Sequence, residues 1–354
     1  MAKAKPEPDA DADDAPGWDA ITAAFESLYP KQKNPPHFAP YLSPLFTGGG
    51  LQGVSAYKAD DPRHWHFVTY GLTELYAKEG GDPALSGWGF ELTFRLTRKA
   101  KDSQPPNWAV NFLFNLGKYV SSSGNPFGVG HYMDLNGPIA LGEDTAIRAI
   151  AFVRDPQLAP IESPNGSVEF LQVVGLTTDE YEACSDWKTE KVMGVLKTID
   201  PLLVTDLGRE SLFADPQAAK AVERGIARDG SQAEFTYVGL AEWKKAGEKF
   251  KVTLGANAVR SLLPKLRSRL MHGRNHRLIG KKRAVNLAPG KRNGVKGKEG
   301  ELTLTMTPTA VEEVLGTLQA VRGKYQFAAL PAVTLEVVPT EIKDSDGKVV
   351  EVIG

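Results

Sequence analysis

The stretch HWHFVTYGLTELY, residues 64–76, decides the fold because its side chains alternate with a period of two and are largely apolar in both registers. From His64 to Tyr70, successive residues would face opposite sides of a strand, so that Trp65 and Phe67 lie on the same side. A strand that is apolar on both faces is typical of the centre of a sheet covered on both sides. We therefore predict a core strand here, with its aromatic side chains buried between a sheet and helices.

Two further segments extend this core. The segment SGWGFELTFRLTR, residues 86–98, alternates apolar and polar residues and predicts a half-buried strand. In PPNWAVNFLFNLGKYV, residues 105–120, the apolar residues instead recur at helical spacing after two prolines that suit a first turn. With the central strand, these segments predict an α/β fold with a core that includes Trp65, Phe67, Phe90, Phe94 and Trp108.

The chain has 354 residues, more than one hydrophobic core usually organises, so two domains are expected. The predicted boundaries are a disordered acidic tail over 1–16, an N-terminal domain over 17–210, a helical linker over 211–231, and a C-terminal domain over 232–345 with a basic loop over 280–300. Pro264 should break or kink any helix in its neighbourhood.

The composition, 42% hydrophobic and 24% charged, is that of a folded chain. No apolar run approaches the roughly 20 residues that span a bilayer, and the N-terminus has no secretory signal. A cytoplasmic location without membrane contact is therefore expected. The single cysteine, Cys184, cannot form an internal disulfide and is interpreted as a small packed residue.

The charge is distributed unevenly. Residues 251–300 hold fourteen lysines and arginines against one acid, Glu299, although the whole chain has a net charge of −1. This basic region could bind nucleic acid through phosphate contacts. However, the 280–300 segment has no interleaved aromatic residues on which bases could stack, so a solvated loop is the favoured interpretation and nucleic acid is not the expected partner.

No catalytic signature is present: the chain has no GxSxG elbow, no GxxxxGK[ST] loop and no HExxH motif. The remaining enzymatic alternative is a metal-dependent enzyme in which His64 and His66 bind a metal ion with His131 or Glu91. Spacing alone does not show that these residues converge, and packed histidines on a strand are favoured. We expect no catalytic residue, metal or cofactor.

The stretches already quoted, together with DPQLAPIESPNGSVEFLQVVGLTTDE (155–180) and LLPKLRSRLMHGRN (262–275), closely resemble the Suppressor of fused family. The resemblance runs from about residue 20 to about residue 340. It implies a non-enzymatic protein of two α/β domains, each a mixed sheet flanked by helices. In animal members, the cleft between the domains closes over an extended peptide of the zinc-finger transcription factors of Hedgehog signalling and holds them in the cytoplasm. The resemblance therefore implies a negative regulator that binds a protein partner by strand addition.

The resemblance also suggests which residues contact the partner. Tyr119 matches a peptide-contacting tyrosine of the family, whereas His131 stands where the family has an aspartate, with Asp134 nearby. Weaker candidates in the second domain are Arg267, Arg269, His272 and Arg274. The change from aspartate to histidine and the short 280–300 loop point to a bacterial member, and bacterial relatives are commonly inferred to be immunity proteins that neutralise toxins.

Overall fold

The computed structural model describes residues 14–40, 50–78, 80–343 and 349–354. It divides the chain into two compact units, one made of Met1–Tyr181 and Met193–Ala218, the other of Glu182–Val192 and Ala219–Gly354. The acidic tail expected over 1–16 lies, up to residue 13, outside the described residues, and the first helix begins at Pro16.

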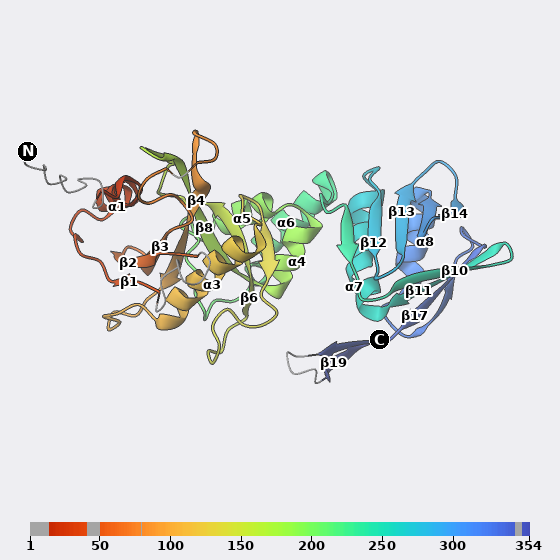
Figure 1. Ribbon diagram of the computed structural model, residues 1–354. Helices are drawn as coiled ribbons and strands as arrows, with labels where there is room; N and C mark the ends of the chain where they lie inside the picture. Colours follow the sequence, from red (N-terminus) through yellow and green to blue (C-terminus); the bar gives the residue numbers. More distant parts are fainter. Residues whose placement is uncertain (1–13, 41–49, 79, 344–348) are drawn as a thin grey trace, which may run out of the picture. The chain divides into compact units, whose positions relative to one another are not determined.

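The first unit is organised by one mixed β-sheet (Figure 1). Within the described residues, its strands run in the order β1-β2-β3-β4-β8-β6-β5, and β7 pairs with β8. Neighbouring strands are antiparallel except β4 and β8, which are parallel. The strands are β1 (His37–Phe38), β2 (Gly53–Asp60), β3 (Arg63–Tyr70), β4 (Leu85–Thr97), β5 (Tyr132–Asp134), β6 (Ile147–Arg154), β7 (Ile161–Ser163) and β8 (Gly166–Thr177).

Strand β3 lies inside the sheet and is buried on both faces, which confirms the prediction from its sequence. On one face, Trp65 and Phe67 share a core cluster with residues of helix α3 (Asn107–Ser123). On the other face, Val68 and Tyr70 share a cluster with residues of helix α1 (Pro16–Leu28). The sheet is therefore covered by a helix on each side, as a strand without a polar face requires.

The other expected core residues differ in burial. Phe90 and Phe94 on β4 are buried at 4% and 0% exposure. Trp108, at the start of α3, is only partly buried and packs against the same cluster, with its ring 6.2 Å from that of Phe94 in an edge-on arrangement. The helix periodicity predicted the face that Trp108 occupies but not that its position near the helix start leaves part of the ring in solvent.

Short helices follow β8: α4 (Thr178–Asp186), α5 (Thr189–Leu196), the 3₁₀ turn η1 (Leu212–Ala214) and α6 (Pro216–Asp229). At the start of α4, the Glu180 carboxylate accepts a 2.9 Å hydrogen bond from the Thr177 backbone N–H, which is one half of a capping box. Helix α6 occupies most of the segment expected as a helical linker over 211–231.

The second unit contains two larger sheets in the described residues, ordered β10-β11-β17-β16 and β14-β15-β13-β12-β9, and a hairpin of β18 and β19. Helix α7 (Ala256–Lys265), the π-helical turn η2 (Leu266–Leu270) and helix α8 (Pro308–Thr317) pack into the same core. The strands are β9 (Phe235–Tyr237), β10 (Ala241–Ala246), β11 (Lys249–Gly255), β12 (His276–Ile279), β13 (Ala284–Pro289), β14 (Gly294–Lys298), β15 (Glu301–Met306), β16 (Gly323–Gln326), β17 (Val333–Val338), β18 (Thr340–Lys343) and β19 (Val349–Ile353).

The structure differs from the sequence-based expectations at two places in this unit. The basic segment 280–300, expected as a loop, holds β13 and β14, which both pair with β15. Pro264 lies inside α7, and the helix continues beyond it as the π-helical turn η2. The predicted break is therefore a change of helical type, since a proline removes one backbone donor but leaves its neighbours free to bond at wider spacing.

No helix in the described part of the chain is both long enough and apolar enough to span a bilayer.

Candidate functional site

The candidate partner site of the first unit lies where α3 ends and β5 begins. Helix α3 ends at Gly124, which adopts a left-handed conformation with φ 69°, and its N–H bonds to the carbonyl of Val120. This glycine turns the chain away from the helix, because a left-handed residue is unstrained only without a Cβ. Tyr119 is thereby left on the last turns of the helix, 41% exposed.

Tyr119 and His131 line one open groove of about 590 Å³. Its base is a stack of aromatic rings: Phe127 lies 5.4 Å from Tyr119 and 4.1 Å from Phe152, in both cases nearly parallel. Phe127 and Phe152 are buried, so the stack fixes the exposed Tyr119 ring on the core of the sheet. The full lining is Tyr119, Asn125, Pro126, Phe127, Gly130, His131, Tyr132, Met133 and Phe152.

The groove adjoins an edge of the sheet. Strand β5 is the last strand of the sheet and pairs with β6 alone among the described residues, with Tyr132 opposite Ala151. The outer edge of a terminal strand is where a further strand can add to a sheet. Tyr132 and Met133 of β5 also line the groove, so main-chain and side-chain contacts are available side by side.

Asp134 also belongs to β5 but does not line the groove. Its side chain Oδ1 accepts a 2.8 Å hydrogen bond from the Asn136 backbone N–H and so stabilises the turn that leaves the strand. Asn136 has φ 55°, a left-handed conformation that asparagine tolerates better than most residues. This geometry gives Asp134 a local structural role.

The four second-domain candidates do not form one exposed surface. Arg267 is exposed and lies 3.9 Å from the Glu312 carboxylate, and His272 is half-buried. Arg269 is buried at 3% exposure and donates hydrogen bonds to the carbonyls of Ser231 and Asn275, at 2.8 and 2.9 Å.

Arg274 donates to the Ser231 carbonyl and, at 3.1 Å, to that of Asp229. Arg269 and Arg274 thus satisfy backbone carbonyls of the 229–231 turn. Sequence alone did not predict this, because charged residues are rarely buried unless they are paired.

His64 and His66 lie in the core. The buried His66 contacts Tyr29 Oη through Nδ1 at 2.9 Å and Asp155 Oδ2 through Nε2 at 3.1 Å. Asp155 also accepts hydrogen bonds of 2.7 and 2.9 Å from both terminal nitrogens of Arg95. Burial, together with the charge of Arg95, lowers the pKa of His66 to about 4. The imidazole is therefore neutral at pH 7, and because a carboxylate only accepts, Nε2 carries the proton.

His64 is held in a similar way. Its Nδ1 lies 2.7 Å from the Pro62 carbonyl, and burial lowers its pKa to about 4. His131 lies instead in the groove. In the described ranges, no three histidine, cysteine or acidic residues are grouped so as to hold a metal ion. Glu91 accepts hydrogen bonds from Thr69, Gly71 and Thr73 and is part of the same sheet core.

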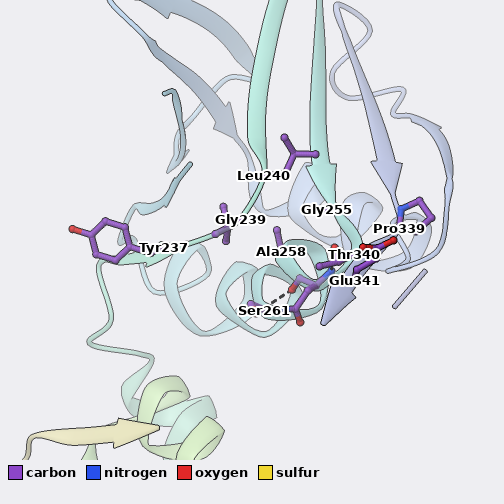
Figure 2. Close-up of a pocket in the computed structure, with 11 residues that line it drawn as sticks. Tyr237, Gly239, Leu240, Gly255, Ala258, Ser261, Pro339, Thr340 and Glu341 are labelled. Carbon is purple, nitrogen blue, oxygen red and sulfur yellow. Dashed lines mark hydrogen bonds between the residues drawn. The ribbon is translucent and has the colours of Figure 1, made fainter. Parts of the chain in front are cut away.

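The second unit has a feature that the sequence reasoning missed. Strand β9 ends its five-stranded sheet, and its Phe235 and Tyr237 are 48% and 74% exposed. Tyr237 also lines a pocket of about 270 Å³ between the start of α7 and residues 339–341 (Figure 2). Figure 2 shows the Tyr237 ring turned away from the other lining side chains. The alternating aromatic residues of EFTY were the only sequence signal for an exposed edge here.

Comparisons with known proteins agree with this fold. A family model described as Suppressor of fused protein (SUFU) matches residues 49–210. The human and mouse Suppressor of fused homologs are each 35% identical to the chain over 234 residues, which cover 61% of this chain and 48% of each relative. The chain thus spans about half the length of the curated relatives it matches.

Two solved structures are also similar. The crystal structure of Drosophila Suppressor of Fused has a TM-score of 0.72 at 21% identity, covers 92% of this chain and 97% of its own, and shows the shared fold. A chain of the Sufu–Fu complex has a TM-score of 0.54 at 29% identity, covering 59% of this chain and 98% of its own. That relative is found in a complex with a partner protein. The expected bacterial origin and toxin-neutralising role find no support in these comparisons, since the curated relatives are animal proteins.

Proposed function

This chain belongs to the Suppressor of fused family, and on that premise we propose that it is a non-enzymatic protein that binds an extended segment of a partner protein. The segment adds a strand at the outer edge of β5 and places a side chain in the adjoining groove. The observation that carries the proposal is that Tyr119 and His131 line one groove beside that edge. A complex between a relative and another protein supports the same class of function.

In strand addition, the backbone and the side chains contribute different parts of the binding. Main-chain hydrogen bonds to the edge give affinity without regard to sequence, while the groove selects one side chain. Tyr119 offers a preorganised aromatic face, because its ring is stacked on the buried Phe127. None of the described residues that line the groove carries a carboxylate, and His131 stands where the family has an aspartate. We therefore expect the groove to select a ligand side chain different from the one that animal members select.

In more detail, we propose that the second domain also contacts this segment, so that the segment is clamped between the two domains. The resemblance to animal members supports this. Arg267 and His272 remain the candidate contacts there. Arg269 and Arg274 are withdrawn, because their guanidinium groups are engaged by backbone carbonyls. As in animal members, binding would hold the partner in the cytoplasm and so inhibit it.

The test is affinity capture of the tagged protein from its own cell extract at moderate salt, followed by mass spectrometry. The Tyr119→Ala/His131→Ala variant is compared with the parent and with Tyr76→Ala, which removes a somewhat more exposed tyrosine outside the groove. One dominant protein that is retained by the parent and the control but lost by the double variant is the expected result. Undiminished capture by the double variant would remove the groove from the site, and retention of nucleic acid alone would move the function to the basic region.

A further inference from the structure

A second free strand edge lies in the second unit. Strand β14 ends the five-stranded sheet on the side opposite β9 and pairs only with β15 among the described residues. Its five residues, GVKGK, are nearly all exposed. A neutral strand with this exposure would invite uncontrolled pairing, and lysines on an edge are one way in which proteins prevent it.

The two faces of β14 differ in kind. Val295 packs against the core, and a Cβ added at Gly297 would lie 2.9 Å from the Trp243 ring, so these residues face inward. Because side chains alternate along a strand, Lys296 and Lys298 face outward together, roughly 7 Å apart. The outward face of the edge therefore presents two ammonium groups at strand spacing.

Further basic residues continue this positive charge at both ends of the strand. The turn that holds Lys281 and Lys282 adjoins the end of β14, because the Ala284 N–H bonds to the Gly300 carbonyl at 3.0 Å. Lys291 and Arg292 lie just before the start of β14. We call these six residues the β14 basic edge: Lys281, Lys282, Lys291, Arg292, Lys296 and Lys298.

The charges of the β14 basic edge are not neutralised locally. Of its six residues, only Lys298 has an ion pair in the described part of the chain, 3.6 Å from the exposed Glu299. The nearby Glu301 carboxylate is occupied by Arg277, at 2.6 Å. Exposed like charges without partners raise the local potential and attract an oppositely charged chain.

We propose that the β14 basic edge binds an extended acidic segment of a protein partner by strand addition. Main-chain hydrogen bonds would extend the sheet beyond β14, and carboxylates on alternate residues of the segment would pair with Lys296 and Lys298. A segment of about seven residues would span the edge from Lys291 to Lys298 at about 3.4 Å per residue. This surface is separate from the β5 groove and adds a second partner contact to the proposed function.

A polypeptide fits this surface better than a nucleic acid does. The edge offers backbone hydrogen bonds in a line, which a strand can use and a nucleic acid cannot. The nearest large aromatic ring, that of Trp243, lies beneath Gly297 and is covered by the guanidinium group of Arg283, 4.7 Å from the ring centroid. Bases would therefore find no open ring on which to stack.

The test measures fluorescence anisotropy of a labelled nine-residue peptide that alternates Glu and Val, titrated with the full chain. We expect saturable binding that weakens as salt is raised, and a loss of about tenfold or more in the Lys296→Glu/Lys298→Glu variant, in which paired charges become like charges. The matched control, Lys99→Glu/Lys101→Glu, makes the same charge change on an exposed loop of the first unit and should bind as the parent does.

Two further probes separate strand addition from the alternatives. Two peptides are compared, one N-methylated at the odd positions and the other at the even positions. Only the peptide whose methylated N–H groups would face β14 should lose binding. Equal binding by both methylated peptides would overturn strand addition. Equal loss in the matched control would overturn the assignment to β14, and a single-stranded oligonucleotide that binds more tightly than the peptide would identify the surface as a nucleic-acid site.

Discussion

Glu91 provides a sharp test of how the first sheet is held together. Its carboxylate is fully buried at the centre of the sheet and accepts four hydrogen bonds of 2.6–2.9 Å, from the hydroxyls of Thr69 and Thr73 and the backbone N–H groups of Gly71 and Thr73. No ion pair to it is present among the described residues. Burial raises its pKa from 4.5 to about 7, although the hydrogen bonds act in the opposite direction.

The sign of the resulting pH dependence follows from the two pKa values. Below pH 4.5 the carboxyl is protonated in both states, and its contribution to stability is complete. As the pH rises through 7, the unfolded state ionises first, so the free energy of unfolding falls by about 3 kcal/mol in total. In Glu91→Gln this contribution is absent, and only a constant cost of about 1–3 kcal/mol for a weakened hydrogen bond remains.

The assay is urea unfolding of parent and Glu91→Gln at pH 5, 6, 7 and 8, followed by tryptophan fluorescence. His64 and His66 have pKa values lowered to about 4, so they cost stability as the pH falls from 6.5 towards 4, but they do so equally in both proteins and cancel in the difference. Because part of the total is already lost at pH 5, the parent's advantage should shrink by about 2.5 kcal/mol from pH 5 to pH 8. Glu162→Gln, an exposed control, should follow the parent. Parallel profiles for parent and Glu91→Gln would refute the reasoning.

Two other predictions concern the same sheet. Trp65→Ala should lower the free energy of unfolding by about 3–5 kcal/mol, because it removes a ring that is 1% exposed, and an unfolding curve that matches the parent would contradict the core role of β3. Asp155→Asn should cost about 3–5 kcal/mol, since it leaves the buried Arg95 guanidinium without its counter-charge. A loss below about 1 kcal/mol in urea titrations at pH 7 would show that Arg95 is compensated elsewhere.

Sequence pattern predicted the elements whose burial follows from local alternation. β3 and β4 were predicted from a period of two, and α3 from helical spacing. β4 was expected to be half-buried, but its polar residues Glu91, Thr93 and Arg95 are buried as well. The pattern failed at β14, where glycine and lysine indicated a loop. That strand forms because it pairs with the regular strand β15, ELTLTM. Pairing with another strand leaves no pattern in the sequence of β14 itself.

The candidate site was predictable only in part. Tyr119 and His131 were identified by family resemblance, and no periodicity in the sequence brings them together. The stack that supports Tyr119 comes from Phe127 in a loop and Phe152 on β6, which meet through the fold alone. The burial of Arg269 was not predictable for the same reason, because one of the two carbonyls that it satisfies, that of Ser231, belongs to a turn about forty residues earlier in the chain.

The support beneath Tyr119 also bears on how a partner would bind. The Tyr119 ring rests on Phe127, and Phe127 rests on the buried Phe152 of β6. A ring held this way loses little conformational entropy when a ligand covers it, so ordering the site subtracts little from the free energy of binding. By contrast, the lysines of β14 are long exposed side chains that must be ordered on binding. The β5 groove is therefore suited to selecting one particular segment, whereas the β14 basic edge is suited to a weaker and salt-sensitive contact.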